Sequence, residues 1–84
     1  YALPLSNAGQ SPEAVAERRE RQQMVLEALD RLTAEQRTVL VLREFQELPY
    51  EEIAQILDIP LGTVKSRISA ARTRLRELLA PERL

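Results

Sequence analysis

The chain has 84 residues, and its 12 basic and 13 acidic side chains give a net charge of −1 at pH 7. This length allows one small domain with a modest hydrophobic core. The chain contains no cysteine and no histidine, which excludes disulfide bonds and the usual zinc sites. No apolar run approaches the ~20 residues of a membrane-spanning helix, and no signal peptide pattern is present, so we expect no membrane insertion and a cytoplasmic location.

Charge is distributed unevenly along the chain. Residues 61–84 contain six basic and two acidic side chains, a net charge of +4, whereas residues 1–60 carry a net charge of −5. A basic end on an acidic body is the pattern that a local contact with nucleic acid requires. Chance segregation of charges in a short chain is the alternative interpretation.

The first ten residues, YALPLSNAGQ, predict a linker, because proline, glycine and small polar residues occur there without helical spacing. We expect a single domain over residues 11–84. The chain begins at Tyr1 and not at Met, which indicates a fragment of a longer protein.

Ser11-Pro12-Glu13 is typical of a helix start, with a hydroxyl cap, proline at the first helical position and an acid in the first turn. We expect this helix to run to about Arg31. Its first half is largely polar and should project from the body. Its second half should be buried along an apolar stripe at spacings of three and four, formed by Val25, Ala28, Leu29 and Leu32.

A capping box, Thr33 with Gln36 three residues later, predicts a second helix from Ala34 to about Gln46. The run Val39–Leu42 is apolar on more than one face, so this helix should form the centre of the core, closed by Phe45 and Leu48. The surplus apolar surface has two interpretations: it is core, or it is an exposed patch for a partner.

Two further helices are predicted, from Tyr50 to Leu57 and from about Leu61 to Leu79, separated by a tight turn. Pro49 ends the preceding helix, and Ile59 should fill the turn. The short helix should bury Ile53, Ala54, Ile56 and Leu57. The predicted fold is therefore all-α, a small domain of about four helices ending in a helix-turn-helix, the motif that places its second helix in the DNA major groove.

Successive residues of the last helix are separated by about 100° around its axis, which sorts its side chains into faces. The apolar stripe contains Val64, Ile68, Ala71, Leu75, Leu78 and Leu79 and must face a core. The opposite face carries the small residues Ser66, Ser69, Ala70 and Thr73. Basic residues border this face on both flanks, Lys65, Arg72 and Arg76 on one and Arg67 and Arg74 on the other. Such flanks would meet the phosphates on either side of a groove.

The start of the last helix offers a second contact with phosphate. Pro60 fixes the turn, and Gly62 leaves the amides near Leu61, Gly62 and Thr63 open to one phosphate oxygen. A basic amphipathic helix is also commonly just a solvated surface, so these patterns alone leave both interpretations open.

The run from Leu32 to Leu79 resembles region 4 of bacterial sigma-70 family sigma factors, most closely the extracytoplasmic-function group. The match lies in YEEIA, a short turn, GTVKSR and a spaced A-R. The resemblance implies a four-helix domain that reads the promoter minus-35 element while bound to RNA polymerase. It also implies the polymerase beta flap and an anti-sigma factor as protein partners, and no cofactor.

The same resemblance implies roles for individual residues. Lys65, Ser66, Ser69 and Arg67 would contact bases, with Lys65 at guanine O6 or N7. Mainly phosphate contacts are implied for Arg72, Arg74 and Arg76, and a phosphate contact for Arg43 and Tyr50. The remaining candidates come from helix geometry: Gly62 and Thr63 lie at the helix start, and Thr73 lies on the small outer face. Alternatively, Arg43 pairs with a carboxylate and Tyr50 only covers the core. Some relatives carry an aromatic residue or arginine at the positions of Ser69 and Ala70, so the base preference stays open.

Two other functions are compatible with parts of the sequence. A LuxR-type regulator domain shares the four-helix plan and the opening LTAEQRTVL, but the loop LREFQELP lacks the glycine expected there and KSRISAAR differs from its helix pattern. A purely protein–protein role, with the basic face covered by an inhibitor, is compatible with a sigma factor as a regulatory state. The sequence does not predict an enzyme, because it has no histidine, cysteine or phosphate-binding glycine loop.

Overall fold

Helices account for most of residues 11–80, the part of the chain that the computed structural model describes. They are α1 (Pro12–Asp30), α2 (Ala34–Leu40), the π-helical segment η1 (Val41–Phe45), α3 (Tyr50–Leu57) and α4 (Leu61–Leu79). The expected all-α fold ending in a helix-turn-helix is confirmed. The linker predicted over residues 1–10, the end of the chain beyond Ala80 and the helix stop expected at Pro81 lie outside the described residues.

The helix starts follow the local chemistry of the sequence. The Ser11 hydroxyl accepts a hydrogen bond from the Ala14 amide at 3.2 Å, which caps α1. At α2, the Thr33 hydroxyl accepts from the Gln36 amide at 3.1 Å, and the Gln36 side chain accepts from the Thr33 amide at 3.2 Å. The capping box predicted from the sequence is therefore present.

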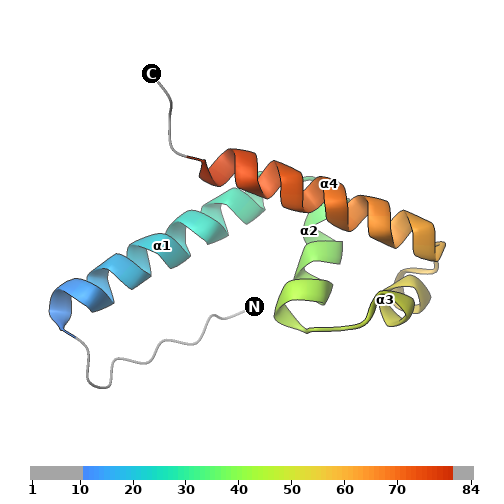
Figure 1. Cartoon of the computed structure of the whole chain (residues 1–84), viewed down its shortest axis with the longest axis horizontal. Helices are drawn as coiled ribbons and strands as arrows, with labels where there is room; N and C mark the ends of the chain where they lie inside the picture. The colour runs from blue at the N-terminus through green and yellow to red at the C-terminus, as the bar shows by residue number, and fades with distance from the viewer. Residues whose placement is uncertain (1–10, 81–84) are drawn as a thin grey trace.

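Helix α4 is the element around which the others pack (Figure 1). It contacts α1, α2 and α3, with α2 beneath its middle and α3 beneath its N-terminal half. Three of its side chains, Val64, Ile68 and Ala71, are fully or almost fully buried. They complete a core with residues from the other helices, namely Leu29, Leu32, Val39, Leu40 and Ile53.

The N-terminal half of α1 extends away from this core (Figure 1), as its polar sequence predicts. The buried residues of α1 are Ala28 and Leu29, both near its C-terminal end. None of the helices in residues 11–80 combines the length and the apolar character that crossing a membrane would need.

One predicted core position is wrong. Ile56 is 55% exposed, although it was expected on the buried side of α3. The buried side is centred on Ile53 and Leu57, which are four residues apart on one stripe, and Ile56 lies about 100° away from Leu57 around the axis. Ile59, expected to fill the turn, is only partly buried, although it packs against the core.

The second predicted helix has the expected extent, but its last turn is wider than an α-helix. The Gln46 amide bonds to the Val41 carbonyl five residues back, at 3.2 Å, and the Leu48 amide bonds to the Leu42 carbonyl at 3.1 Å. Glu47 closes the turn with a φ of 56°. This π turn changes the face presented after Val41, leaving Leu42 and Phe45 packed against the core and Glu44 exposed.

The connection between α3 and α4 is a hydrogen-bonded turn. Asp58 has left-handed backbone angles, φ 54° and ψ 51°. The Ile59 amide bonds to the Ala54 carbonyl at 3.1 Å and the Asp58 amide to the Gln55 carbonyl at 3.3 Å, which is the Schellman arrangement of a helix C-terminus. These bonds fix the path of the chain into α4.

Replacing Ile68 by alanine should lower the free energy of unfolding by about 2–5 kcal/mol, because the side chain is 1% exposed and its removal leaves a cavity. Ile56→Ala is the matched control, since the same atoms are removed from a largely exposed site, and it should change stability by no more than about 0.5 kcal/mol. Urea unfolding followed by circular dichroism measures both. Equal losses would contradict the placement of these two residues.

Candidate nucleic-acid interface

The outer face of α4 is made of small side chains. Ser66, Ser69, Ala70 and Thr73 are all exposed, while Val64, Ile68 and Ala71 on the opposite side are buried. This is the sorting of faces that the sequence predicted. With short side chains outward, the backbone of α4 can approach another surface closely.

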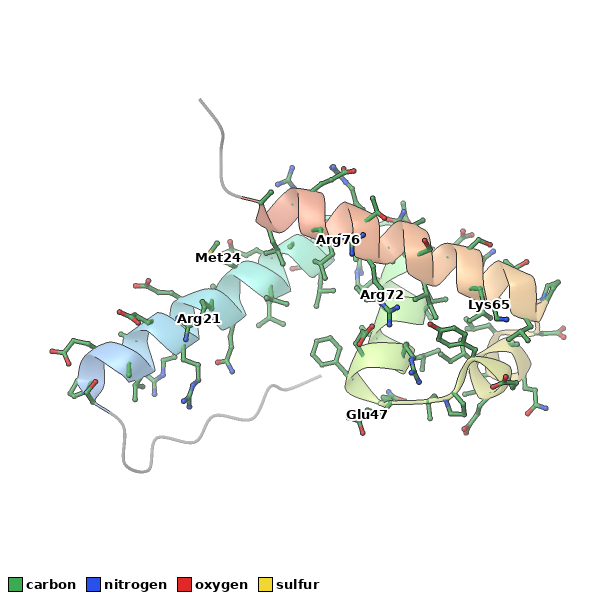
Figure 2. The ribbon with its side chains drawn as sticks, in the orientation of Figure 1. Arg21, Met24, Glu47, Lys65, Arg72 and Arg76 are labelled. Atoms are coloured by element: carbon green, nitrogen blue, oxygen red, sulfur yellow. The ribbon has the colours of Figure 1, made fainter. Side chains whose placement is uncertain are left out.

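Basic residues line a hollow along one flank of this face. The hollow has a volume of about 410 Å³, and its basic members are Lys65, Arg72 and Arg76; Tyr50, Ile68 and Ser69 complete it. Figure 2 shows the three basic residues spaced along α4, with Arg72 between the other two and directed toward the α2–η1 segment below. The hollow therefore combines positive charge with a hydroxyl group next to the outer face.

Arg72 is held by a carboxylate from another helical segment. Its Nε and Nη2 atoms donate to Oε1 of Glu44 in η1, at 2.8 and 2.5 Å. This hydrogen bonding raises the pKa of Arg72, so the guanidinium stays positively charged. The two side chains are 42% and 44% exposed, so the pair lies at the surface.

The other flank also carries carboxylates beside its arginines. Arg67 lies 3.8 Å from Glu35 at the start of α2, and Arg74 lies 3.2 Å from Glu77 one turn further along α4. Exposed ion pairs of this kind contribute only about 0–1 kcal/mol, so phosphates can displace them. The two basic flanks are present, but they are partly neutralised, which the sequence interpretation did not include.

The start of α4 differs from the expectation at Thr63. Its amide donates to the Pro60 carbonyl at 3.0 Å, as the Val64 amide does at 3.2 Å, so the Thr63 amide is not open. The Leu61 and Gly62 amides belong to the first turn of α4, where no carbonyl of the helix is in reach, and remain the candidate anion contacts. A Cβ atom at Gly62 would meet nothing within 4 Å, so packing does not require glycine there.

Ser66, Arg43 and Tyr50 are each in contact with neighbouring groups of the chain. The Ser66 hydroxyl donates to the Gly62 carbonyl at 2.7 Å, so its oxygen can only accept from a ligand. Arg43 donates to the Leu48 carbonyl at 3.0 Å, and its guanidinium carbon lies 5.1 Å from the centre of the Tyr50 ring. The alternative in which Arg43 pairs with a carboxylate is not what the structure shows, because Arg43 contacts a backbone carbonyl and the face of Tyr50. Tyr50 packs against the core, as one of its two interpretations expected, and it also lines the basic hollow. Its contact with phosphate stays a prediction.

The sequence interpretation missed Glu44. It is separated from Arg72 by 28 residues, and no spacing pattern connects them. Their contact depends on the crossing of α4 over the α2–η1 segment. The only sign of it in the sequence is that Glu44 is the acidic residue of the segment VLREF, whose other residues are apolar or basic.

Comparison with known proteins agrees with this geometry. The family model "Sigma-70, region 4" matches residues 22–75. A sigma-H factor of Pseudomonas aeruginosa is 42% identical over 72 residues, covering 86% of this chain and 37% of the relative. ECF sigma-E factors of Escherichia coli K12 and Haemophilus influenzae are each 39% identical, covering 84% and 74% of this chain and 37% and 33% of the relatives.

The chain spans about a third of the length of these relatives. The match includes α3, α4 as far as Leu75, and every residue that lines the basic hollow except Arg76. It also confirms the resemblance to the extracytoplasmic-function group. The chain belongs to the sigma-70 region 4 family, as a helix-turn-helix DNA-binding domain of the sigma-factor type.

Proposed function

We propose that this domain recognises the minus-35 element of promoters for an alternative sigma factor of the extracytoplasmic-function group, and so directs RNA polymerase to initiate transcription. The observation that carries the proposal is the sorting of α4 into a buried apolar side and an exposed face of small residues with basic flanks. Family membership favours this function over the LuxR-type alternative.

The recognition mechanism follows from dimensions and charge. The major groove is about 12 Å wide, close to the diameter of a helix with its side chains, so the small outer residues let α4 sit deep in it. Lys65, Ser66, Arg67 and Ser69 are then nearest to base edges. Phosphates would be held by Arg72, Arg74 and Arg76, by Arg43 with Tyr50, and by the start of α4 at Gly62 and Thr63. At Thr63 the side chain would make the contact, since its amide is occupied. Thr73 belongs to the small face that would enter the groove.

The protein partners are part of the same proposal. The domain would act in the cytoplasm, docked on the beta flap of core RNA polymerase, and an anti-sigma factor would control it. These partners rest on the family resemblance. Complexes in which an inhibitor covers the basic face would then be a regulatory state of the domain, not a separate function.

Selection from a random duplex library tests the proposal. The purified chain, with and without core RNA polymerase, should enrich a short asymmetric sequence, and duplexes altered only in that element should lose binding. Enrichment of a palindrome by a dimer would favour a LuxR-type regulator instead. A library with no enriched sequence under either condition would contradict promoter recognition.

Two substitutions should separate base contacts from phosphate contacts. Lys65→Ala should relax the preference at one base pair, at a cost of about 1–3 kcal/mol in discrimination, whereas Arg74→Ala should weaken binding to all duplexes alike. The salt dependence should fall by about one charge in Arg74→Ala. Fluorescence anisotropy on selected and scrambled duplexes across a salt series measures both. Identical behaviour of the two variants would contradict these assignments.

Gly62→Ala should separate binding from stability. Alanine favours a helix over glycine by about 0.5–1 kcal/mol, and the position has open space, so the variant should be at least as stable as the parent chain. DNA binding should weaken, because the added methyl group stands between the phosphate and the start of α4. Thermal unfolding and anisotropy provide the two measurements. Unchanged affinity would remove Gly62 from the interface.

A further inference from the structure

Glu44 is the acidic residue in closest contact with the basic flank, and its geometry differs from that of the other ion pairs. It receives two donors of Arg72, Nε and Nη2, on one carboxylate oxygen. Arg74 pairs with a carboxylate of its own helix, and Arg67 lies 3.8 Å from Glu35. Within residues 11–80, Arg72 is thus the one basic side chain of α4 with two hydrogen bonds to a carboxylate of a different helical segment.

The contact fixes Arg72 at the boundary between two hollows. One is the basic hollow with Lys65 and Arg76, and the other, of about 280 Å³, is lined by Arg43, Glu44, Glu47 and Arg72. A guanidinium group has five N–H donors, the bonds to Glu44 use two of them, and Tyr50 also interacts with the group. Donors therefore remain for a phosphate while Glu44 still holds the side chain.

Such a pair has little value for folding, because surface ion pairs contribute only marginally to stability. Its value for binding is different. A free arginine loses rotamer entropy when it binds a phosphate, and a side chain that is already fixed loses less. A fixed arginine also meets a phosphate well in only one register of the duplex, and phosphate contacts of this kind set the register in which bases are read.

We propose that Glu44 is a positioning residue, which holds Arg72 so that the domain engages DNA in the register that brings Lys65 and Ser69 to their bases. This inference rests on the proposed promoter recognition. Without Glu44, Arg72 can follow the phosphates in any register. Non-specific binding is then kept or strengthened while the matched duplex loses its advantage.

The test compares variants of the full chain by anisotropy on the duplex selected by the parent chain and on a scrambled duplex. Glu44→Gln should reduce the ratio of the two affinities roughly two- to tenfold, the range expected for ordering one long side chain. Glu47→Gln is the matched control, because it removes the same charge from the same hollow without touching the Arg72 pair. It should shift both affinities equally and leave their ratio unchanged.

A second comparison shows whether Glu44 acts through Arg72. In an Arg72→Gln background, Glu44→Gln should produce no further change in the ratio, while circular dichroism shows that the variants remain folded. An unchanged ratio in Glu44→Gln, or an equal fall in Glu47→Gln, would overturn the role of Glu44 while leaving promoter recognition intact. If the parent chain itself does not discriminate between the duplexes, promoter recognition is contradicted, and the role of Glu44 falls with it.

Discussion

Burial of one stripe of α4 determines the orientation of everything on its surface. Val64, Ile68 and Ala71 are held in the core beneath α4, which fixes the rotation of that helix about its own axis. Because adjacent residues differ by about 100°, a shift of the stripe by a single position would turn the small face toward the flank and bring a basic side chain into the core. The core therefore specifies which residues can meet DNA.

The fold was largely predictable because its signals are local. Hydroxyl caps, prolines and apolar spacing marked the helix starts at Ser11 and Thr33 and the break at Pro49, and the structure contains each of them. Ile56 shows where such reasoning ends. An apolar residue at the edge of the buried stripe of a short helix can be either buried or exposed. Which of the two occurs depends on packing neighbours from other parts of the chain.

The candidate site was predictable only in part. The faces of α4 follow from helical geometry, which the sequence contains in full. The partners of its arginines do not, because Glu44 and Glu35 reach them only through the packing of α4 against other elements. The π turn at Val41–Phe45 is a second example. It places Glu44 at the surface within reach of Arg72, and no local sequence motif predicts it. Residue roles on DNA remain predictions.

The overall charge of −1 conceals a local balance on the candidate binding surface of α4. At physiological salt, charges separated by more than about 8 Å are screened from each other, so the acidic residues of distant helices have little influence on α4. Carboxylates in direct contact with arginines have much more. A basic flank that is partly neutralised gives weaker general attraction to DNA, and discrimination then depends more on contacts made in the correct register.

The projecting half of α1 has a practical consequence (Figure 1). Its first ten or so residues extend about 15 Å at the rise of an α-helix, and the buried residues of α1 begin only at Ala28. Backbone amides there should exchange with solvent through local opening, independently of the core. A fluorophore attached at an exposed position of this half, such as Glu17, would therefore report the direction of the domain on a larger assembly without disturbing either the core or the candidate DNA-binding face of α4.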